Sequence, residues 1–190
     1  MRHDASMPTH VALLRGINLG SHKRVAMAAL REVVASLGHA DVATYIQSGN
    51  VVFTAADGLP VGAADLEKTI ETELGVSCRV VVRTCAELAQ VVADNPYPDE
   101  PNPKLVHAIF LTDDPSAEAE AHVAAAQQRA AARGSRDETR LVGRTLYLHT
   151  PDGFGRSKLA EELSRPRGTA EGTARNWATV LALLAMCEGP

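Results

Sequence analysis

Aromatic residues are scarce in this chain, and positive charge is not in excess. Phenylalanine, tryptophan and tyrosine together make up 4% of the 190 residues, and 19 lysine and arginine residues stand against 23 acidic ones, for a formal net charge of −4. Proteins that bind nucleic acids normally have a basic surface, and many stack bases on aromatic side chains. The composition therefore disfavours a nucleic-acid-binding protein, and only a local basic groove would be compatible with it.

Cysteine is also rare. Cys78, Cys85 and Cys187 are odd in number, and no two of them form a Cys-x-x-Cys pair. This pattern is not that of a disulfide framework or of a structural zinc site. We therefore expect three reduced thiols in a cytoplasmic protein, and the sequence indicates no metal and no cofactor.

The chain lacks long hydrophobic runs. Its most apolar stretch, "WATVLALLAMC", is too short to cross a bilayer. The first ten residues are polar and contain no apolar core of the kind that a signal peptide needs. Both observations predict a cytoplasmic protein with no membrane partner.

Apolar periodicity divides the first half of the chain into alternating strands and helices. Residues at helical spacing end at a glycine, and short β-compatible runs end at turn-forming residues. The predicted order is strand, helix, strand, strand, helix and strand, over residues 10–18, 26–37, 41–47, 51–55, 66–74 and 78–84. This is the order of the ferredoxin-like, or split βαβ, fold.

The second half repeats most of this order after a helix over 86–93 and a linker. The linker, residues 95–103, contains four prolines, which prevent regular structure. Strand, helix, strand, strand and helix are then predicted over residues 104–112, 115–133, 138–142, 145–149 and 157–164. A helix over 173–188 stands where a fourth strand would be expected. We predict an α+β chain of two ferredoxin-like subdomains that arose by duplication and pack as one compact unit, over 8–94 and 104–190, the second one incomplete and ending in a helix.

Strands in both halves are apolar on both faces. Leu13 and Leu14 are adjacent in the first strand, and Val80 to Val82 form a continuous apolar run in the fourth. A ferredoxin-like sheet has helices on one face only, so these residues would leave an exposed apolar face on an isolated subdomain. We expect the two halves, or a second chain, to cover these faces, and the oligomeric state stays open.

Polar residues gather at several predicted loop positions. Arg15 and Asn18 end the first strand, and Gln47, Ser48 and Asn50 belong to the first hairpin turn. Such residues are also the ones that turns prefer for conformational reasons alone. They are therefore candidates for a binding site or for an ordinary turn.

Two predicted helix starts carry cations. Ser157 and Lys158 open one helix, and Arg175 and Asn176 lie in the first turn of the other, after Thr173 as the expected N-cap. Positive charge is disfavoured at a helix N-terminus, and an anion bound there would reverse this effect. The alternative is that these cations pair with Glu161, Glu162 or Glu171, or point to solvent.

Other familiar signals are missing or ordinary. His107 alternates with Leu105 and Ile109, which is typical of a core histidine. The segment "GFGRSK" is not a phosphate-binding P-loop, and "IQSGN" lacks the glycine that a nucleophile elbow needs. Nothing here indicates a reaction, so whether the protein is an enzyme stays open.

Several longer blocks resemble a known family. The segments "VALLRGINLG", "TYIQSGNVVF", "NPYP", "KLVHAIFL", "GRSKL" and "TARNW" are similar, in this order, to the bacterial family catalogued as domain of unknown function 1697. The resemblance runs from about residue 10 to about residue 185. It implies a cytosolic bacterial protein with two ferredoxin-like subdomains, and it implies no reaction and no functional residue.

Three hypotheses about function follow. In the first, the protein binds a small phosphorylated or carboxylated ligand in the cleft between the subdomains. In the second, it is a structural or protein-interaction module without a small ligand, and Arg15 is a buried structural cation. In the third, it binds nucleic acid through a local basic groove. The candidate ligand-binding residues of the first hypothesis are Arg15, Asn18, Gln47, Ser48, Asn50, Ser157, Lys158, Arg175 and Asn176.

Overall fold

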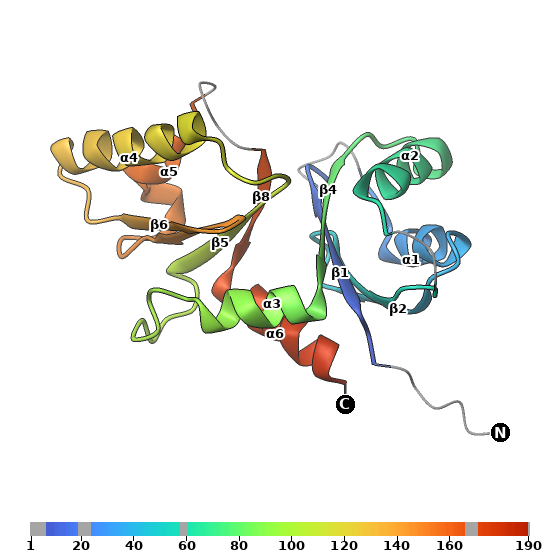
Figure 1. Cartoon of the computed structure of the whole chain (residues 1–190). Coiled ribbons are helices and arrows are strands. Elements are labelled where there is room, and N and C mark those ends of the chain that lie inside the picture. Colours follow the sequence, from blue (N-terminus) through green and yellow to red (C-terminus); the bar gives the residue numbers. More distant parts are fainter. Residues whose placement is uncertain (1–6, 19–23, 58–60, 166–170, 190) are drawn as a thin grey trace. The chain divides into compact units, whose positions relative to one another are not determined.

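The computed structural model divides the chain into two compact units (Figure 1). Unit 1 consists of residues 1–90 and 181–190, and unit 2 consists of residues 91–180. The structure describes residues 7–18, 24–57, 61–165 and 171–189.

Unit 1 contains the predicted β-α-β-β-α-β order. Its four strands form one antiparallel sheet in the order β2-β3-β1-β4. Figure 1 shows both helices of this series on the same face of the sheet. The elements are β1 (His10–Arg15), α1 (Met27–Ser36), β2 (Ala40–Tyr45), β3 (Asn50–Thr54), α2 (Ala63–Leu74) and β4 (Arg79–Thr84).

The two faces of this sheet are both buried. Because side chains alternate along a strand, one set of residues faces the helices and the next set faces away. The helix-facing set, which includes Ala12, Leu14 and Phe53, forms a core with the apolar stripes of α1 and α2. The opposite face is equally buried, since Leu13 and Val52 are 0% exposed. The apolar residues of both parities are therefore buried within the single chain.

Unit 2 repeats this architecture. Its four strands are also antiparallel, in the order β6-β7-β5-β8, which matches the first sheet strand for strand. A short 3₁₀ helix, η1 (Phe154–Arg156), precedes the second helix. The elements are β5 (Val106–Leu111), α4 (Ala117–Ala132), β6 (Glu138–Val142), β7 (Thr145–His149), α5 (Lys158–Leu163) and β8 (Gly172–Asn176). The chain therefore has the predicted α+β fold with two ferredoxin-like subdomains.

One sequence-based expectation about unit 2 is wrong. Residues 172–176 form the fourth strand, β8, and the helix α6 (Trp177–Glu188) begins only after it. β8 pairs with β5, for example with Ala174 opposite Ile109. The Asn176 side chain then accepts a hydrogen bond from the Thr179 amide at 2.9 Å, which marks the true start of the helix. Gly172, Thr173 and Asn176 are weak helix formers, and pairing with β5 makes this segment a strand, so the second subdomain is complete.

Two helices are shared between the units. In α3 (Cys85–Ala93), residues 85–90 belong to unit 1 and residues 91–93 to unit 2. In α6, residues 177–180 belong to unit 2 and residues 181–188 to unit 1. The units therefore differ from the predicted ranges 8–94 and 104–190. The proline-rich segment 95–103 forms neither helix nor strand.

The expectation of three reduced thiols is also wrong. Cys85, at the start of α3, and Cys187, near the end of α6, form a disulfide with a Cα–Cα distance of 5.7 Å. Cys78 takes no part in this disulfide. The two bonded residues are 102 positions apart in the sequence, so only the fold reveals that these helix ends meet within unit 1.

No helix in the described ranges is long and apolar enough to cross a membrane.

Candidate functional site

The predicted site residues of unit 1 come together at one end of its sheet. Asn18 donates from Nδ2 to the Gln47 carbonyl at 2.8 Å and to the Val25 carbonyl at 3.1 Å, and its Oδ1 accepts from the Val25 amide. Asn18 thus ties the end of its own loop to the first hairpin. It adopts a positive φ of 54°, which asparagine tolerates better than most residues.

The hairpin residues are held by the turn itself. Asn50 is fully buried, and its Nδ2 donates to the Tyr45 carbonyl at 3.2 Å and to Ser48 Oγ at 2.9 Å. Gly49 packs so closely on β1 that a Cβ there would lie 2.8 Å from Leu14 Cβ. These contacts join the blocks "LLRGIN" and "IQSGN", and they give Asn18, Ser48 and Asn50 a structural role in the loop.

Arg15 is exposed. It is the last residue of β1 and lies opposite Arg79 of β4. Arg79 in turn forms an exposed ion pair with Glu67 at 3.3 Å. The hypothesis that Arg15 is a buried structural cation is therefore wrong. Arg15 lies at the end of the strand, where its side chain is exposed to solvent.

Ser157 and Lys158 lie at the start of α5, as predicted. Ser157 Oγ accepts from the Ala160 amide at 2.9 Å and donates to Asp137 at 2.9 Å. The Lys158 ammonium donates to the Arg133 carbonyl, at the C-terminal end of α4. A helix C-terminus favours positive charge, so this contact explains the cation at the start of α5 without an anion.

Arg175 is a strand residue, so the argument from a cation in the first turn of a helix does not apply to it. Arg175 is 8% exposed, and its Nη1 donates to Thr173 Oγ1 at 2.7 Å and to the Ala174 carbonyl at 2.8 Å. Burial lowers the pKa of this guanidinium to about 10. Asn176 caps α6, as described above.

A second buried arginine, Arg83, is not recognisable from the sequence pattern. Arg83 in β4 is 4% exposed and lies opposite Val11, while Arg175 in β8 lies opposite Ala108. Val11 and Ala108 occupy equivalent positions in the two sheets. Val11 lies two residues before Leu13, which pairs with the first residue of β3. Ala108 lies two residues before Phe110, which pairs with the first residue of β7. Both arginines donate from Nη1 to the preceding carbonyl, at 2.9 and 2.8 Å. The duplication therefore repeats a buried arginine at one position of each sheet.

His107 is a core residue, as its spacing predicts. It is 9% exposed, and its ring packs on Phe154 of η1 with 4.4 Å between ring centroids. Burial lowers the pKa of His107 to about 4. Its Nδ1 is buried without a hydrogen-bond partner in the described part of the chain. The imidazole is consequently neutral at neutral pH.

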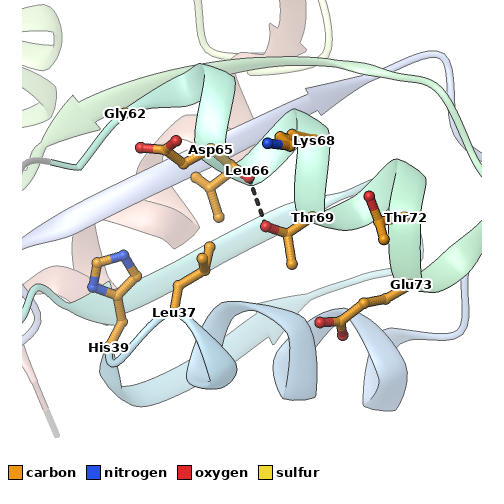
Figure 2. Close-up of a pocket in the computed structure, with 9 residues that line it drawn as sticks. All are labelled: Leu37, His39, Gly62, Asp65, Leu66, Lys68, Thr69, Thr72 and Glu73. Atoms are coloured by element: carbon orange, nitrogen blue, oxygen red, sulfur yellow. Dashed lines mark hydrogen bonds between the residues drawn. The ribbon is translucent and has the colours of Figure 1, made fainter.

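A cavity of about 610 Å³ lies in unit 1 between helix α2 and the segment that follows α1 (Figure 2). We call it the α2 groove. None of the nine predicted site residues lines it. Its lining is formed by Leu37, His39, Gly62, Asp65, Leu66, Lys68, Thr69, Thr72 and Glu73.

His39 is the buried polar residue of the α2 groove. Its side chain is 8% exposed, and its ring packs on Phe53 at a centroid distance of 4.8 Å. The same residue lines a second, smaller cavity of about 370 Å³ beside α1 and the start of β2, together with Arg31 and Asp41. His39 thus lies between the two cavities.

The protonation state of His39 follows from its surroundings. Burial, and secondarily the charge on His10, lower the pKa of His39, so its ring is neutral at neutral pH. Nδ1 accepts a hydrogen bond from the Ala56 amide at 3.4 Å, which places the single proton on Nε2. No described residue forms a hydrogen bond with Nε2. A mostly buried side chain therefore offers one N–H group to the groove.

Sequence reasoning missed His39 and the α2 groove. The polar residues of α2 show the periodicity of any solvent-facing helix side, and a single histidine after a helix-ending glycine is not a recognisable motif. Within the described ranges, no three His, Cys, Asp or Glu side chains lie close enough to hold a metal ion.

Comparisons with known proteins agree with the fold. The family model that matches the chain describes a protein of unknown function (DUF1697) and covers residues 7–147. Among solved structures, the chain is similar to the conserved bacterial protein SP0830 from Streptococcus pneumoniae, with 21% identity and a TM-score of 0.65. That match covers 96% of this chain and 99% of the other. No curated protein matches the chain at a significant level.

Proposed function

Since this chain belongs to the DUF1697 family, for which no activity is described, we propose from geometry that it is a binding protein for a small polar ligand and that the ligand occupies the α2 groove. The observation that carries this proposal is the Nε2–H of His39. The imidazole is largely buried and packs on Phe53, so this N–H is held in a fixed orientation and donates to water or to a ligand. Here that donor faces a cavity large enough for a small molecule.

The composition of the groove supports the proposal. Binding sites for small molecules combine an apolar base with a few polar groups that orient the ligand. Leu66 is 1% exposed and Leu37 is partly buried, so they supply the apolar base. Figure 2 shows Leu37 and His39 on one side of the groove and the polar residues of α2 on the other. A ligand between them would contact both sides.

Amide NMR spectra of the ¹⁵N-labelled chain test this proposal. The chain is titrated with a panel of neutral, amine-bearing and phosphorylated sugars. We expect at least one sugar to shift the amide signals of residues 37–39 and 62–73, and we expect His39→Phe to weaken that binding at least about tenfold, the effect of losing one hydrogen bond and leaving its partner unpaired. The phenyl ring keeps the aromatic packing on Phe53.

His10→Phe is the matched control. His10 packs on the same Phe53 ring, at a centroid distance of 5.8 Å, but it does not line the α2 groove. This variant should bind as the wild type does. Shifts confined to other surfaces, equal loss of binding in both variants, or no shift at all would contradict the proposal and would favour a structural module without a ligand.

A second candidate function is the binding of a phosphorylated or carboxylated ligand at Arg175. Its supporting observation is the burial of this guanidinium, which is 8% exposed and whose pKa is lowered by burial, because a desolvated cation would gain from a nearby anion. The other cations of the original hypothesis add little, since Lys158 contacts the Arg133 carbonyl and Arg15 is exposed at the end of β1. The location of such a ligand between the subdomains stays a prediction.

Titration with inorganic phosphate tests the second candidate without a variant. The side-chain Nε–H signal of Arg175 should shift with saturation, and the equivalent signal of Arg83 serves as the internal reference. Identical, non-saturating shifts of both signals would indicate a general salt effect and would remove this candidate.

A further inference from the structure

Building on the proposed function, we infer that the ligand of the α2 groove is a small hydroxylated amine, such as an amino sugar, and not an anion. The groove is rich in hydrogen-bond acceptors and has an excess of negative charge. The residues of α2 that bring oxygen acceptors to its lining are Asp65, Thr69, Thr72 and Glu73, which recur at the spacing that places side chains on one helix face.

Thr69 offers the groove an acceptor only. Its hydroxyl donates to the Asp65 carbonyl one turn earlier, at 2.8 Å, and Figure 2 marks this bond. Because a hydroxyl has one hydrogen, the remaining lone pairs of Thr69 Oγ1 can only accept. A ligand group that contacts Thr69 must therefore be a donor.

The Asp65 carboxylate is held at the N-terminal end of the groove. Its Oδ2 lies so close to the N-cap Gly62 that a Cβ on that glycine would be 2.9 Å away. The first turn of a helix stabilises a carboxylate, since its amide groups carry partial positive charge. Gly62 therefore leaves room for the carboxylate beside the backbone, on the same side of the groove as Thr69 (Figure 2).

The charges of the lining residues sum to a negative value. Asp65 and Glu73 are acidic, Lys68 is the single cationic side chain among the lining residues, and His39 is neutral at neutral pH. A phosphate or carboxylate would meet repulsion from the two carboxylates, whereas an ammonium group would be attracted. The electrostatics of the groove therefore favour a ligand with an amine.

His39 adds the requirement for hydroxyl groups. Its Nε2–H offers a donor to the ligand, and the threonine and carboxylate oxygens offer acceptors. A hydroxyl group satisfies both kinds of partner, because it donates one hydrogen and accepts through two lone pairs. A ligand with several hydroxyls and one amine matches this set of groups better than an apolar or a purely cationic molecule.

Four related sugars test the inference in the NMR titration. Glucosamine carries an amine, and N-acetylglucosamine has the same ring with that amine converted to a neutral amide. Glucose has no nitrogen group, and glucose 6-phosphate carries a negative charge. We expect glucosamine to bind about two- to fivefold more tightly than N-acetylglucosamine, the size of effect that an exposed ion pair produces. Glucose 6-phosphate should bind most weakly.

Two charge-neutralising variants assign the effect to the groove. Asp65→Asn should abolish the preference for glucosamine. Glu71→Gln removes one negative charge from an exposed position of the same helix outside the groove lining, and it should leave the preference unchanged. Thermal unfolding of each variant verifies that it is folded.

The outcomes separate this inference from the proposed function. Tight binding of glucose 6-phosphate at the groove, or a glucosamine preference that survives Asp65→Asn, would overturn the inference that the ligand carries an amine. Either result would still leave the α2 groove as a binding site. If none of the four sugars shifts the groove signals, the inference and the small-ligand function both fail.

Discussion

At the scale of single residues, buried polar groups distinguish this chain more than its exposed charges do. Arg83, Arg175, His107 and His39 are all less than one tenth exposed, whereas Arg15, which interrupts the first strand in the sequence, is exposed. An exposed cation is hydrated at no expense to the fold. A buried one has to be compensated, so its surroundings determine its chemistry.

His107 should make the protein acid-sensitive. Its pKa is about 4 in the folded chain and near 6.5 when unfolded, so the unfolded state binds more protons between these values. Stability is therefore complete above about pH 6.5 and falls as the pH drops towards 4. Urea unfolding at pH 7 and pH 4.5 should show that His107→Leu loses about 2 kcal/mol less on acidification than the wild type does. Equal losses in both proteins would contradict the assignment.

Gly49 is the position where the hairpin tolerates no side chain. Its φ is 73°, and a Cβ would lie 2.8 Å from both Ile17 Cδ1 and Leu14 Cβ. Gly49→Ala should destabilise the protein by about 2–4 kcal/mol in urea unfolding, through backbone strain and overpacking together. Gly143 also has a positive φ but no atom within 4 Å of such a Cβ, so Gly143→Ala should lose only about 1 kcal/mol. Similar losses at both sites would argue against close packing at Gly49.

At the scale of elements, an acidic residue joins the two helices of unit 2. Glu162 of α5 is 1% exposed and contacts Arg129 at 2.7 Å, Arg133 at 3.0 Å and Arg165 at 2.9 Å. Hydrogen bonds from Arg129, the largest cause, and from Arg133, together with the charge of Arg165, lower the pKa of Glu162. Two of the arginines belong to α4 or its C-cap, so this carboxylate holds α5 against α4.

Neutralising Glu162 should therefore loosen the pair α4 and α5. Glu162→Gln is expected to lower the melting temperature clearly more than Glu161→Gln, because the Glu161 side chain is 55% exposed and its pairing with Arg133, at 3.0 Å, is screened by solvent. Circular dichroism melting curves at neutral pH compare the variants. The wild type should also lose this contribution as the pH falls through the lowered pKa of Glu162. Equal melting temperatures for the two variants would show that the charge of the buried Glu162 carboxylate does not stabilise the packing of α5 on α4.

The sequence predicted most of these elements correctly. Strands and helices with strong apolar periodicity, such as β1, α1 and α2, lie where the spacing puts them. β8 was missed because its five residues precede an apolar helix without a turn signal, and only pairing with β5 distinguishes strand from helix there. Local patterns report local preferences, whereas a strand at that position depends on a partner more than 60 residues earlier.

The candidate site was less accessible from the sequence. Loop residues such as Asn18 and Asn50 are polar for reasons of backbone geometry, and their hydrogen bonds are used within the hairpin. His39 is unremarkable in the sequence, and its importance arises from burial beside a helix that is 24 residues or more away. A cavity results from the packing of the folded chain, so no sequence pattern predicts it.

At the scale of the whole molecule, the Cys85–Cys187 disulfide closes a long loop of the chain. It links residues 102 positions apart, a span that includes all of unit 2. A cross-link of this length restricts the unfolded chain strongly. In the chain-entropy account it stabilises the folded state by up to about 4–5 kcal/mol.

Reduction of the purified protein should therefore lower its resistance to urea. We expect a dithiol reductant to shift the unfolding midpoint downward, and Cys85→Ser to unfold at the same midpoint with or without the reductant. Cys78→Ser is the control, since Cys78 is outside the bond and this variant should respond as the wild type does. A midpoint that reductant leaves unchanged in the wild type would contradict a stabilising role for the bond.

The division of unit 1 into two chain segments also orders events during synthesis. Residues 1–90 leave the ribosome first, but the segment 181–190 that belongs with them is made only after every residue of unit 2. Unit 2 is one continuous segment of the chain. Unit 1 has to wait for the last turns of α6, and the Cys85–Cys187 bond cannot form before Cys187 has emerged. Unit 1 is thus begun before unit 2 and completed after it.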